Sequence, residues 1–361
     1  MRDPLTEARD LAGWEPSLGV VSVYLGFDPG DRGGAWRTDL RNGLDQLLER
    51  AKEAEHERRV ALRATAQRLL SRFEDGELRP PPHGEAGFVE VAESKGEERW
   101  WPTSLAPAAG DCVQLGGRAA VAPLVDLRCR ERECGVVLLS SERVRLLRLS
   151  GGELSELEEW ELSITSLDWR ERKASSGPNP THGVSSSGHD QFHERLEHNR
   201  RRFLAECAGL VGARLHEHDL DHALAFGLAH EQEEFASGFH APGIVLEQGA
   251  RADLISTPTG QLADHVLGAA EEAARSRDRA LVERVLEAAR GGGRGAAGRQ
   301  DVGEALAEGR VEQLVLDAAI GAPAEDLVRG ALGGHAKVAL VRGETAEPLA
   351  SAEGAAALLR Y

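Results

Sequence analysis

The residues with the clearest chemical potential lie where a polar segment gives way to a helical one. Eleven of the sixteen residues from Lys173 to Gly188 are Ser, Gly, Pro or Asn, a composition typical of a loop. From Asp190, a favourable N-cap residue, the apolar residues recur at helical spacing. The sequence therefore predicts a loop over residues 173–191 that brings Gly188 and Gln191 to the start of a helix.

Gln191 and Gly188 are the candidate catalytic residues of this segment. A glutamine side chain cannot act as a general base, so any catalytic use of Gln191 must be positional. Its backbone or side-chain amide would orient a water molecule and hold a developing oxyanion, while Gly188 allows the loop its turn. Such a role requires a partner that supplies the reactive ester and the remainder of the site.

The helix that follows carries four arginines with the geometry to contact phosphate oxygens. They are Arg195, Arg200, Arg201 and Arg202. The formal net charge of the whole chain is −17, which argues against capture of nucleic acid over the whole surface. Any nucleic-acid contact is therefore expected to be local to this basic helix. The alternative interpretation is a surface loop followed by a solvated amphipathic helix.

Other motifs that could hold a metal or a cofactor are weak. Residues 216–222 read HEHDLDH, but only one pair of histidines there has the spacing of a one-face helical metal site. His189 and His193 are four residues apart without the glutamate placement of HExxH. The glycine cluster over 291–298 lacks the Gly-Lys-Ser/Thr of a phosphate-binding loop and has no strand before it. The sequence therefore predicts no metal and no cofactor.

The elements that would position these residues alternate between helix and strand. Apolar spacing and turn residues predict a β-hairpin around Gly151–Gly152 and a long helix over 258–290 that the glycine cluster ends. Strands are expected over 20–27, 87–93, 99–105, 118–127, 311–316 and 336–341, and helices over 36–73 with a break near His56, over 302–307 and over 324–332.

Composition limits the class of protein. With 41% hydrophobic residues in 361, the chain can build ordinary cores in two to three domains. Its four cysteines lack the CxxC spacing of zinc sites and no secretory segment precedes them, so free thiols are expected. No apolar run approaches the length needed to cross a bilayer. The sequence predicts a cytoplasmic protein without membrane contact, and a monomer.

Two separated segments resemble one known family. GRQDVGEALAEGRVEQLVL, from Gly298, is similar to the opening of the third domain of archaeo-eukaryotic class 1 release factors and Pelota. EGAAALLRY, over 353–361, resembles the close of the same domain. VVSVYLGF near the start, and LDWRERKA before the polar loop, are similar to bacterial members of this superfamily.

The resemblance implies an architecture of both α/β and α+β type with three domains. It implies an N-terminal α+β domain over 1–127, a central ribonuclease H-like domain over 128–272 that carries the loop and the basic helix, and an L7Ae-like α/β domain over 273–361.

The resemblance also implies a site. In that family a Gly-Gly-Gln loop ahead of an arginine-bearing helix enters the peptidyl transferase centre of the ribosome. Aligning Arg195 with the family's arginine places Gln191 on the glutamine, preceded by His189 and Asp190 where the family has two glycines. The pattern Gly188-x-x-Gln191 resembles that of bacterial relatives of the eukaryotic quality-control peptidyl-tRNA hydrolase.

Three functions remain open at this point. The first is a release or rescue factor that enters the A site and hydrolyses peptidyl-tRNA, with the four arginines on rRNA and a translational GTPase as a candidate partner at the third domain. The second, favoured by replacement of the paired glycines, is a non-catalytic factor that occupies idle ribosomes, similar to the hibernation protein Balon. The third is an RNA-binding adaptor that uses the L7Ae-like domain alone.

Overall fold

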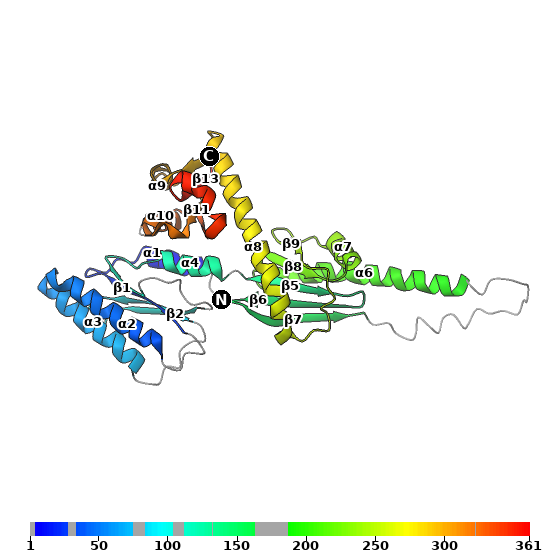
Figure 1. Cartoon of the computed structure of the whole chain (residues 1–361), viewed down its shortest axis with the longest axis horizontal. Helices are drawn as coiled ribbons and strands as arrows, with labels where there is room; N and C mark the ends of the chain where they lie inside the picture. The colour runs from blue at the N-terminus through cyan, green and yellow to red at the C-terminus, as the bar shows by residue number, and fades with distance from the viewer. Residues whose placement is uncertain are drawn as a thin grey trace, which may run out of the picture. The chain divides into compact units, whose positions relative to one another are not determined.

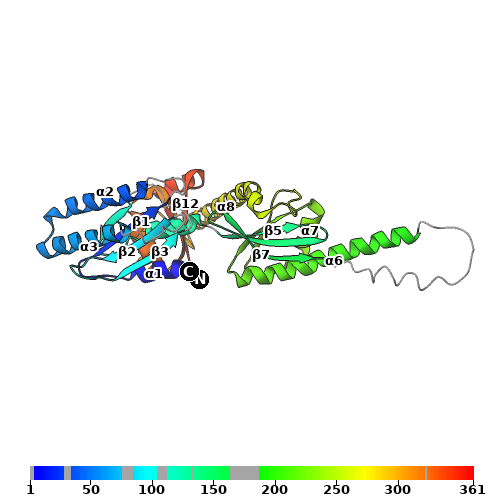
Figure 2. The same cartoon turned by 90° about the horizontal axis from the view of Figure 1, so that it is seen from below.

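The computed structural model describes residues 4–27, 34–74, 84–103, 112–131, 133–162, 187–321 and 323–361. The chain forms two compact units (Figures 1 and 2). Unit 1 combines Met1–Arg132 with Arg275–Tyr361, and unit 2 is Glu133–Ala274. The boundary between Ala274 and Arg275 lies inside a single long helix, α8 (Thr259–Arg290).

The N-terminal part of unit 1 is a four-stranded antiparallel sheet of order β3-β2-β1-β4 with helices on both faces. Its strands are β1 (Val20–Gly26), β2 (Gly84–Glu90), β3 (Glu98–Thr103) and β4 (Val113–Gly116). Alternate residues of β1 enter two different cores, as the two-residue period of a strand requires. One core contains α2 (Ala35–Arg50), the short helix η1 (Ala51–Glu53) and α3 (His56–Glu74), and the other contains α1 (Pro4–Ala12) and α4 (Ala122–Arg130).

The C-terminal part of unit 1 is a second four-stranded sheet, of order β10-β13-β11-β12. Only β11 and β12 run parallel. The strands are β10 (Gly295–Ala297), β11 (Val311–Asp317), β12 (Lys337–Val341) and β13 (Ala355–Leu359). Helices α9 (Arg299–Ala307) and α10 (Pro323–Gly333) pack into one core, and the second half of α8 packs with η5 (Glu347–Ala352) into the other.

The two parts of unit 1 share one hydrophobic core. Leu11 of α1 and Leu124 of α4 are fully buried in the same cluster as Val328 and Leu332 of α10. Helices α1 and α4 therefore contact their own sheet and α10 as well. Because dry, shared packing of this kind resists relative motion, the two parts of unit 1 form a single folded body.

Unit 2 is built on a five-stranded mixed sheet of order β7-β6-β5-β8-β9. An antiparallel meander of three strands is followed by two strands parallel to β5, which is the ribonuclease H-like order. Helices α6 (Ser187–Glu217) and α7 (Ala229–Gly238) pack on one face and the first half of α8 on the other. The strands are β5 (Cys134–Leu139), β6 (Arg143–Ser150), β7 (Glu153–Glu161), β8 (His222–Phe226) and β9 (Val245–Gln248).

The predicted fold class is confirmed, because mixed α/β layers are built on three sheets. The predicted hairpin is present, and Gly151 and Gly152 both have positive φ, 58° and 85°, the conformation of a tight hairpin turn. The strand predicted over 118–127 is wrong, since α4 covers most of it. Pro123 lies in the first turn of α4, where its missing N–H costs nothing, and Leu124 and Leu127 share one face.

The division of unit 1 into separate first and third domains, with boundaries at 127 and 273, stays a prediction. Within the described residues, no helix is long and apolar enough to cross a membrane. The four cysteines are free thiols, as predicted.

Candidate nucleic-acid interface

Helix α6 begins at Ser187, so Gly188 and Gln191 lie in its first two turns. The predicted helix start at Asp190 is therefore three residues late, because Ser and Gly are both tolerated at a helix N-terminus. The predicted loop lies outside the described residues as far as residue 186. The structure describes the helical backbone at Gly188 and Gln191 but not their side chains, which stay predicted site residues.

Helix α6 has a packed half and a projecting half. From Phe203 onward its apolar side chains enter the core of unit 2, including Leu204, Val211 and Leu215. None of residues 194–202 is buried, and Figures 1 and 2 show this end of α6 extending beyond the strands of unit 2. At 1.5 Å per residue, Gln191 lies about 18 Å along the helix from Phe203. Residues 194–202 are thus the solvated part of a projecting arm, and the helix from Phe203 onward is the packed segment that holds it.

Arg200 sits where the arm meets the packed segment. Its guanidinium donates to Glu142, with Nε 3.2 Å from Oε1, and to Glu197 at 2.8 Å. The hydrogen bond to Glu142 is the main cause that raises the pKa of Arg200 above its usual value. Because Glu142 lies in the turn between β5 and β6, this pair ties α6 to the turn at the end of two inner strands of the sheet.

The other three arginines differ in their partners. Arg202 pairs with Glu206 at 2.8 Å along the helix, and Arg201 lies 3.5 Å from Glu234 of α7. Arg195 is exposed and has no partner among the described residues. Exposed ion pairs contribute only about 0–1 kcal/mol, so a phosphate could replace the glutamates of Arg201 and Arg202 at little cost. Counting contacts with described residues alone, Arg195 has no partner, and Arg201 and Arg202 have partners that a phosphate could replace.

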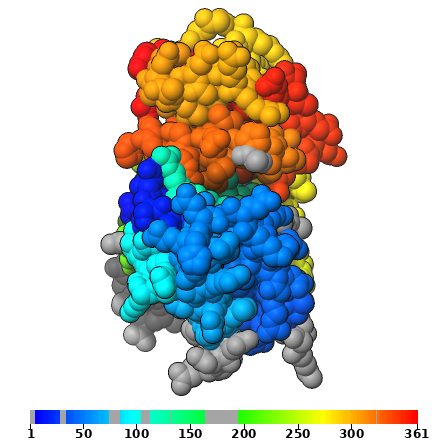
Figure 3. Space-filling view, turned by 90° about the vertical axis from the view of Figure 1, so that its left-hand side faces the viewer, coloured from blue at the N-terminus to red at the C-terminus, as the bar shows by residue number. Residues whose placement is uncertain are grey.

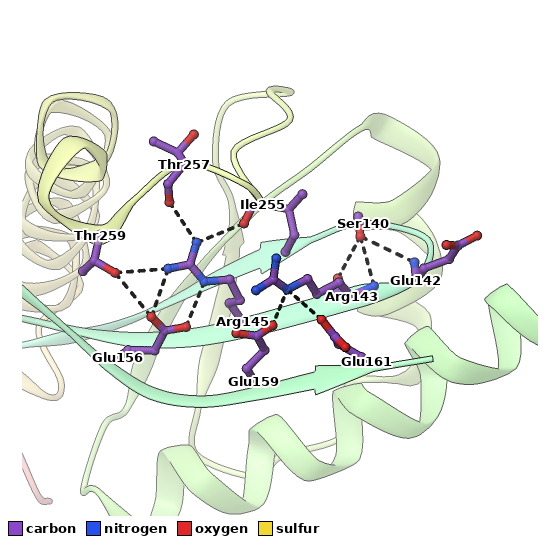
Figure 4. Close-up of polar contacts among 10 residues, drawn as sticks. All are labelled: Ser140, Glu142, Arg143, Arg145, Glu156, Glu159, Glu161, Ile255, Thr257 and Thr259. Atoms are coloured by element: carbon purple, nitrogen blue, oxygen red, sulfur yellow. Dashed lines mark hydrogen bonds and ion pairs between the residues drawn. The ribbon is translucent and has the colours of Figure 1, made fainter. Parts of the chain in front are cut away.

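A buried arginine that sequence analysis did not single out lies on the face of the unit 2 sheet that packs against α8, on the other side from α6 (Figure 4). The guanidinium of Arg145 on β6 forms two hydrogen bonds with Glu156 of β7, at 2.9 and 3.0 Å. It also donates to the backbone carbonyls of Ile255 and Thr257 and to the hydroxyl of Thr259, at 2.9–3.1 Å. Since its side chain is only 7% exposed, Arg145 anchors the start of α8 to the sheet that carries α6.

The histidines of residues 216–222 do not converge. His216 is exposed at the end of α6, Asp219 has a left-handed backbone with φ 55°, and His222 contacts its neighbour Asp221 at 2.7 Å. In the part of the chain that the structure describes, no group of three or more His, Cys, Asp or Glu side chains is placed to hold a metal ion.

Comparison with known families gives a match over the middle of the chain. Residues 120–290 match the family described as bacterial archaeo-eukaryotic release factor family 10. This segment contains all of unit 2 and the whole of α6 and α8. The match supports, for this segment, the resemblance to archaeo-eukaryotic release factors that the sequence predicted.

Solved structures of the superfamily cover much of the chain at low identity. The archaeal translation termination factor aRF1 is 20% identical, with 99% of this chain and 97% of aRF1 covered and a TM-score of 0.27. Dom34 of S. cerevisiae, a termination-like factor, is 10% identical over 77% of this chain and 79% of Dom34, with a TM-score of 0.42. Archaeal Pelota, from a model of ribosome-bound Pelota and ABCE1, is 13% identical, with 99% and 94% covered and a TM-score of 0.43. A search of curated proteins found no match.

Proposed function

We propose that this chain is a ribosome-associated release or rescue factor that enters the A site and places the start of α6 at the peptidyl transferase centre. The observation that carries the proposal is that no residue from 194 to 202 of α6 is buried, whereas the helix from Phe203 onward packs into the core of unit 2. A helix that extends about 18 Å past its last packed turn can enter a narrow site while its domain stays outside. The superfamily match over 120–290 supports the same use of this helix.

In this proposal Gln191 positions water at the ester of peptidyl-tRNA. In the helical conformation the backbone N–H of Gln191 is directed to the carbonyl four residues earlier, so the side-chain amide is the group free to act. An amide can donate to a developing oxyanion and accept from water. The basic group that removes the proton of the water would come from the tRNA and the ribosome. Gly188, three residues before Gln191, would let the first turn open.

The proposed partners follow from the same placement. Arg195 would contact an rRNA phosphate directly, and Arg201 and Arg202 would exchange glutamate for phosphate as the arm enters. Arg200 would stay paired with Glu142 and contact rRNA through its remaining N–H groups. The C-terminal domain, predicted over 273–361, would face a translational GTPase. The factor would act in the cytoplasm as a monomer, without a metal or cofactor.

Release of nascent chains from 70S and 50S peptidyl-tRNA complexes tests the catalytic half of the proposal. We expect release by the wild-type chain and a loss of about 10²-fold or more in Gln191→Ala, the usual effect of removing one oxyanion donor. Gln261→Ala, a substitution of an exposed glutamine in α8, is the matched control and should release normally. Equal release by wild type and Gln191→Ala would remove Gln191 from the mechanism.

A second candidate, a non-catalytic occlusion factor, is favoured by one structural observation. Helix α6 includes Gly188 to Gln191, so the segment that would have to act as a catalytic loop is helical. The replacement of the paired glycines by His189 and Asp190 also reduces the backbone freedom of this turn. Tight ribosome binding without release by either protein would select this function over hydrolysis.

A further inference from the structure

A large polar groove runs along β4 in unit 1. Its volume is about 1360 Å³, above the range of about 300–1,000 Å³ that is usual for small-molecule sites. One wall is formed by α2, the start of α3 and β4, and the other by the starts of α4 and α10, η3 (Ala318–Ile320) and the end of β12. Figure 3 shows this face of the molecule, with α2 and α3 in blue beneath the orange of the C-terminal part.

The floor of the groove is an open strand edge. Among the described strands, β4 is the last of its sheet and pairs only with β1. The backbone N–H of Tyr24 donates to the carbonyl of Cys112. In an antiparallel pair, residues whose backbone groups face the partner strand alternate with residues whose groups face away. The backbone N–H and C=O groups of Val113 and Leu115 therefore point away from β1. No described residue hydrogen-bonds to them, so they form a template for one more strand.

Side chains of α2 run beside this edge. Asn42, Gln46 and Arg50 are four residues apart and so share one face of α2, and all three line the groove. None of the three side chains has a hydrogen-bond partner among the described residues. Two amides and a guanidinium in a row offer donors and acceptors at intervals along an extended chain.

The groove is positive at one end. Arg50 ends α2, and Arg58 lies in the first turn of α3. Its Nη2 is 3.4 Å from the position that a Cβ on Gly19 would take, and the carbonyl oxygen of Gly116, the last residue of β4, lies next to the same position. Arg68 and Arg72 of the same helix each donate to a neighbouring acceptor. The Nε atoms of all three arginines are buried without a partner, but Arg58 differs because no described acceptor pairs with any other atom of its guanidinium. A half-buried guanidinium without an acceptor is a binding group for an anion.

We propose that this groove binds an extended, acidic peptide segment of a partner protein. The segment would add to β4 as a fifth strand, exchanging backbone hydrogen bonds with Val113 and Leu115. Its carboxylates would pair with Arg50 and Arg58. Every other pairing in this sheet is antiparallel, and β4 runs toward the arginines, so an antiparallel addition places the acidic residues at the N-terminal end of the peptide.

Fluorescence anisotropy with the full-length chain tests this site. The probe is a fluorescein-labelled peptide of three Glu residues followed by alternating Thr and Val. One control peptide carries the three Glu residues at its C-terminal end. A second control peptide is N-methylated at alternate residues, which removes the backbone N–H groups that would donate to β4. We expect the first peptide to bind most tightly and the N-methylated peptide not to bind. Bound peptide should also slow hydrogen exchange of the Val113 and Leu115 amides.

Arg58→Ala should weaken binding about tenfold, the effect of losing one charge-assisted hydrogen bond. Arg63→Ala is the matched control, because Arg63 is an exposed arginine of the same helix that does not line the groove. Equal binding of the N-methylated peptide, or no binding at about 1 mM, would overturn the proposal. Displacement by single-stranded RNA with equal protection of β4 would assign the groove to nucleic acid instead. Neither result depends on whether α6 enters the ribosome.

Discussion

Glu325 and Arg329, one turn apart on α10, are paired at 2.5 Å and together hold the ends of two helices from the other part of unit 1. The carboxylate of Glu325 accepts the backbone N–H groups of Val121 and Ala122, at 3.0 and 2.8 Å, where α4 begins. Arg329 donates to the carbonyl of Ala12, at 2.9 Å, where α1 ends. A negative group thus caps a helix N-terminus and a positive group a C-terminus, as the helix dipole favours.

Replacing Glu325 should destabilise unit 1. Glu325→Ala leaves two N–H groups at the start of α4 without an acceptor and Arg329 without its charge partner. We expect a loss of about 2 kcal/mol in the free energy of unfolding, from the usual range for caps and charged hydrogen bonds. Urea unfolding followed by circular dichroism measures it. Glu344→Ala, an exposed glutamate change in the same unit, should cost less than about 0.5 kcal/mol. Equal stability of the two variants would show that the cap is unimportant.

Arg145 and Arg143 provide a matched pair on β6 (Figure 4). Arg145→Ala removes the buried guanidinium that joins β7 to the residues before α8. It should lower the free energy of unfolding by about 2–4 kcal/mol. Arg143 instead pairs with Glu159 and Glu161 at the surface, so Arg143→Ala should lower the free energy of unfolding by at most about 1 kcal/mol. Hydrogen exchange should rise at residues 254–262 in Arg145→Ala only. A similar rise in both variants would contradict the role of Arg145 as an anchor.

The pair of Arg145 and Glu156 also predicts a pH dependence. The hydrogen bonds from Arg145 are the main cause that lowers the pKa of Glu156 below its ordinary 4.5. The unfolded chain therefore binds a proton at a higher pH than the folded chain, and this stability is complete above about pH 4.5 and is lost as pH falls through the folded pKa. Urea unfolding between pH 6 and 3 should show a steeper loss for wild type than for Glu156→Gln. Parallel curves would mean that Glu156 is not held in its ionised form.

Cys207 should be inert in the folded protein. Burial raises the pKa of its thiol to about 12, so at pH 8 only about one molecule in ten thousand carries the reactive thiolate. Cys112 is half-buried in the groove and should be alkylated first. Iodoacetamide labelling followed by peptide mass spectrometry distinguishes the two, with a guanidinium-unfolded sample as control. Native labelling of Cys207 as fast as Cys112 would contradict the buried position.

Much of the fold could be predicted from local patterns. The spacing of apolar residues in α8, and its stop at the glycine cluster, are properties of the adjacent sequence alone. The short strand β10 was missed, because Gly295–Ala297 has no side chain larger than a methyl group and acquires its structure by pairing with β13. The predicted strand over 118–127 was wrong, because a short run of apolar residues suits either a strand or a helix.

The polar contacts within each unit that join residues far apart in the sequence could not be predicted from local patterns. Arg145 meets Ile255 and Thr259, more than a hundred residues later, and Glu325 caps a helix about two hundred residues earlier. No local pattern encodes such pairs, although an arginine on the alternating strand β6 was a signal that a buried partner was needed. The candidate residues of α6 could be proposed from the sequence, because the helical spacing and the charges there depend on neighbouring residues alone.

The central claim, that α6 enters the ribosomal A site, is tested most directly by co-sedimentation with 70S ribosomes whose A site is empty or filled with tRNA. We predict binding to the empty A site and competition by tRNA. Arg195→Glu reverses the charge of the arginine that has no partner among the described residues, and it should weaken binding about tenfold or more at fixed salt. Lys52→Glu, a change on an exposed lysine of unit 1, should have no effect. Binding that is insensitive to A-site tRNA and to Arg195→Glu, or no binding to any ribosomal particle, would contradict the account.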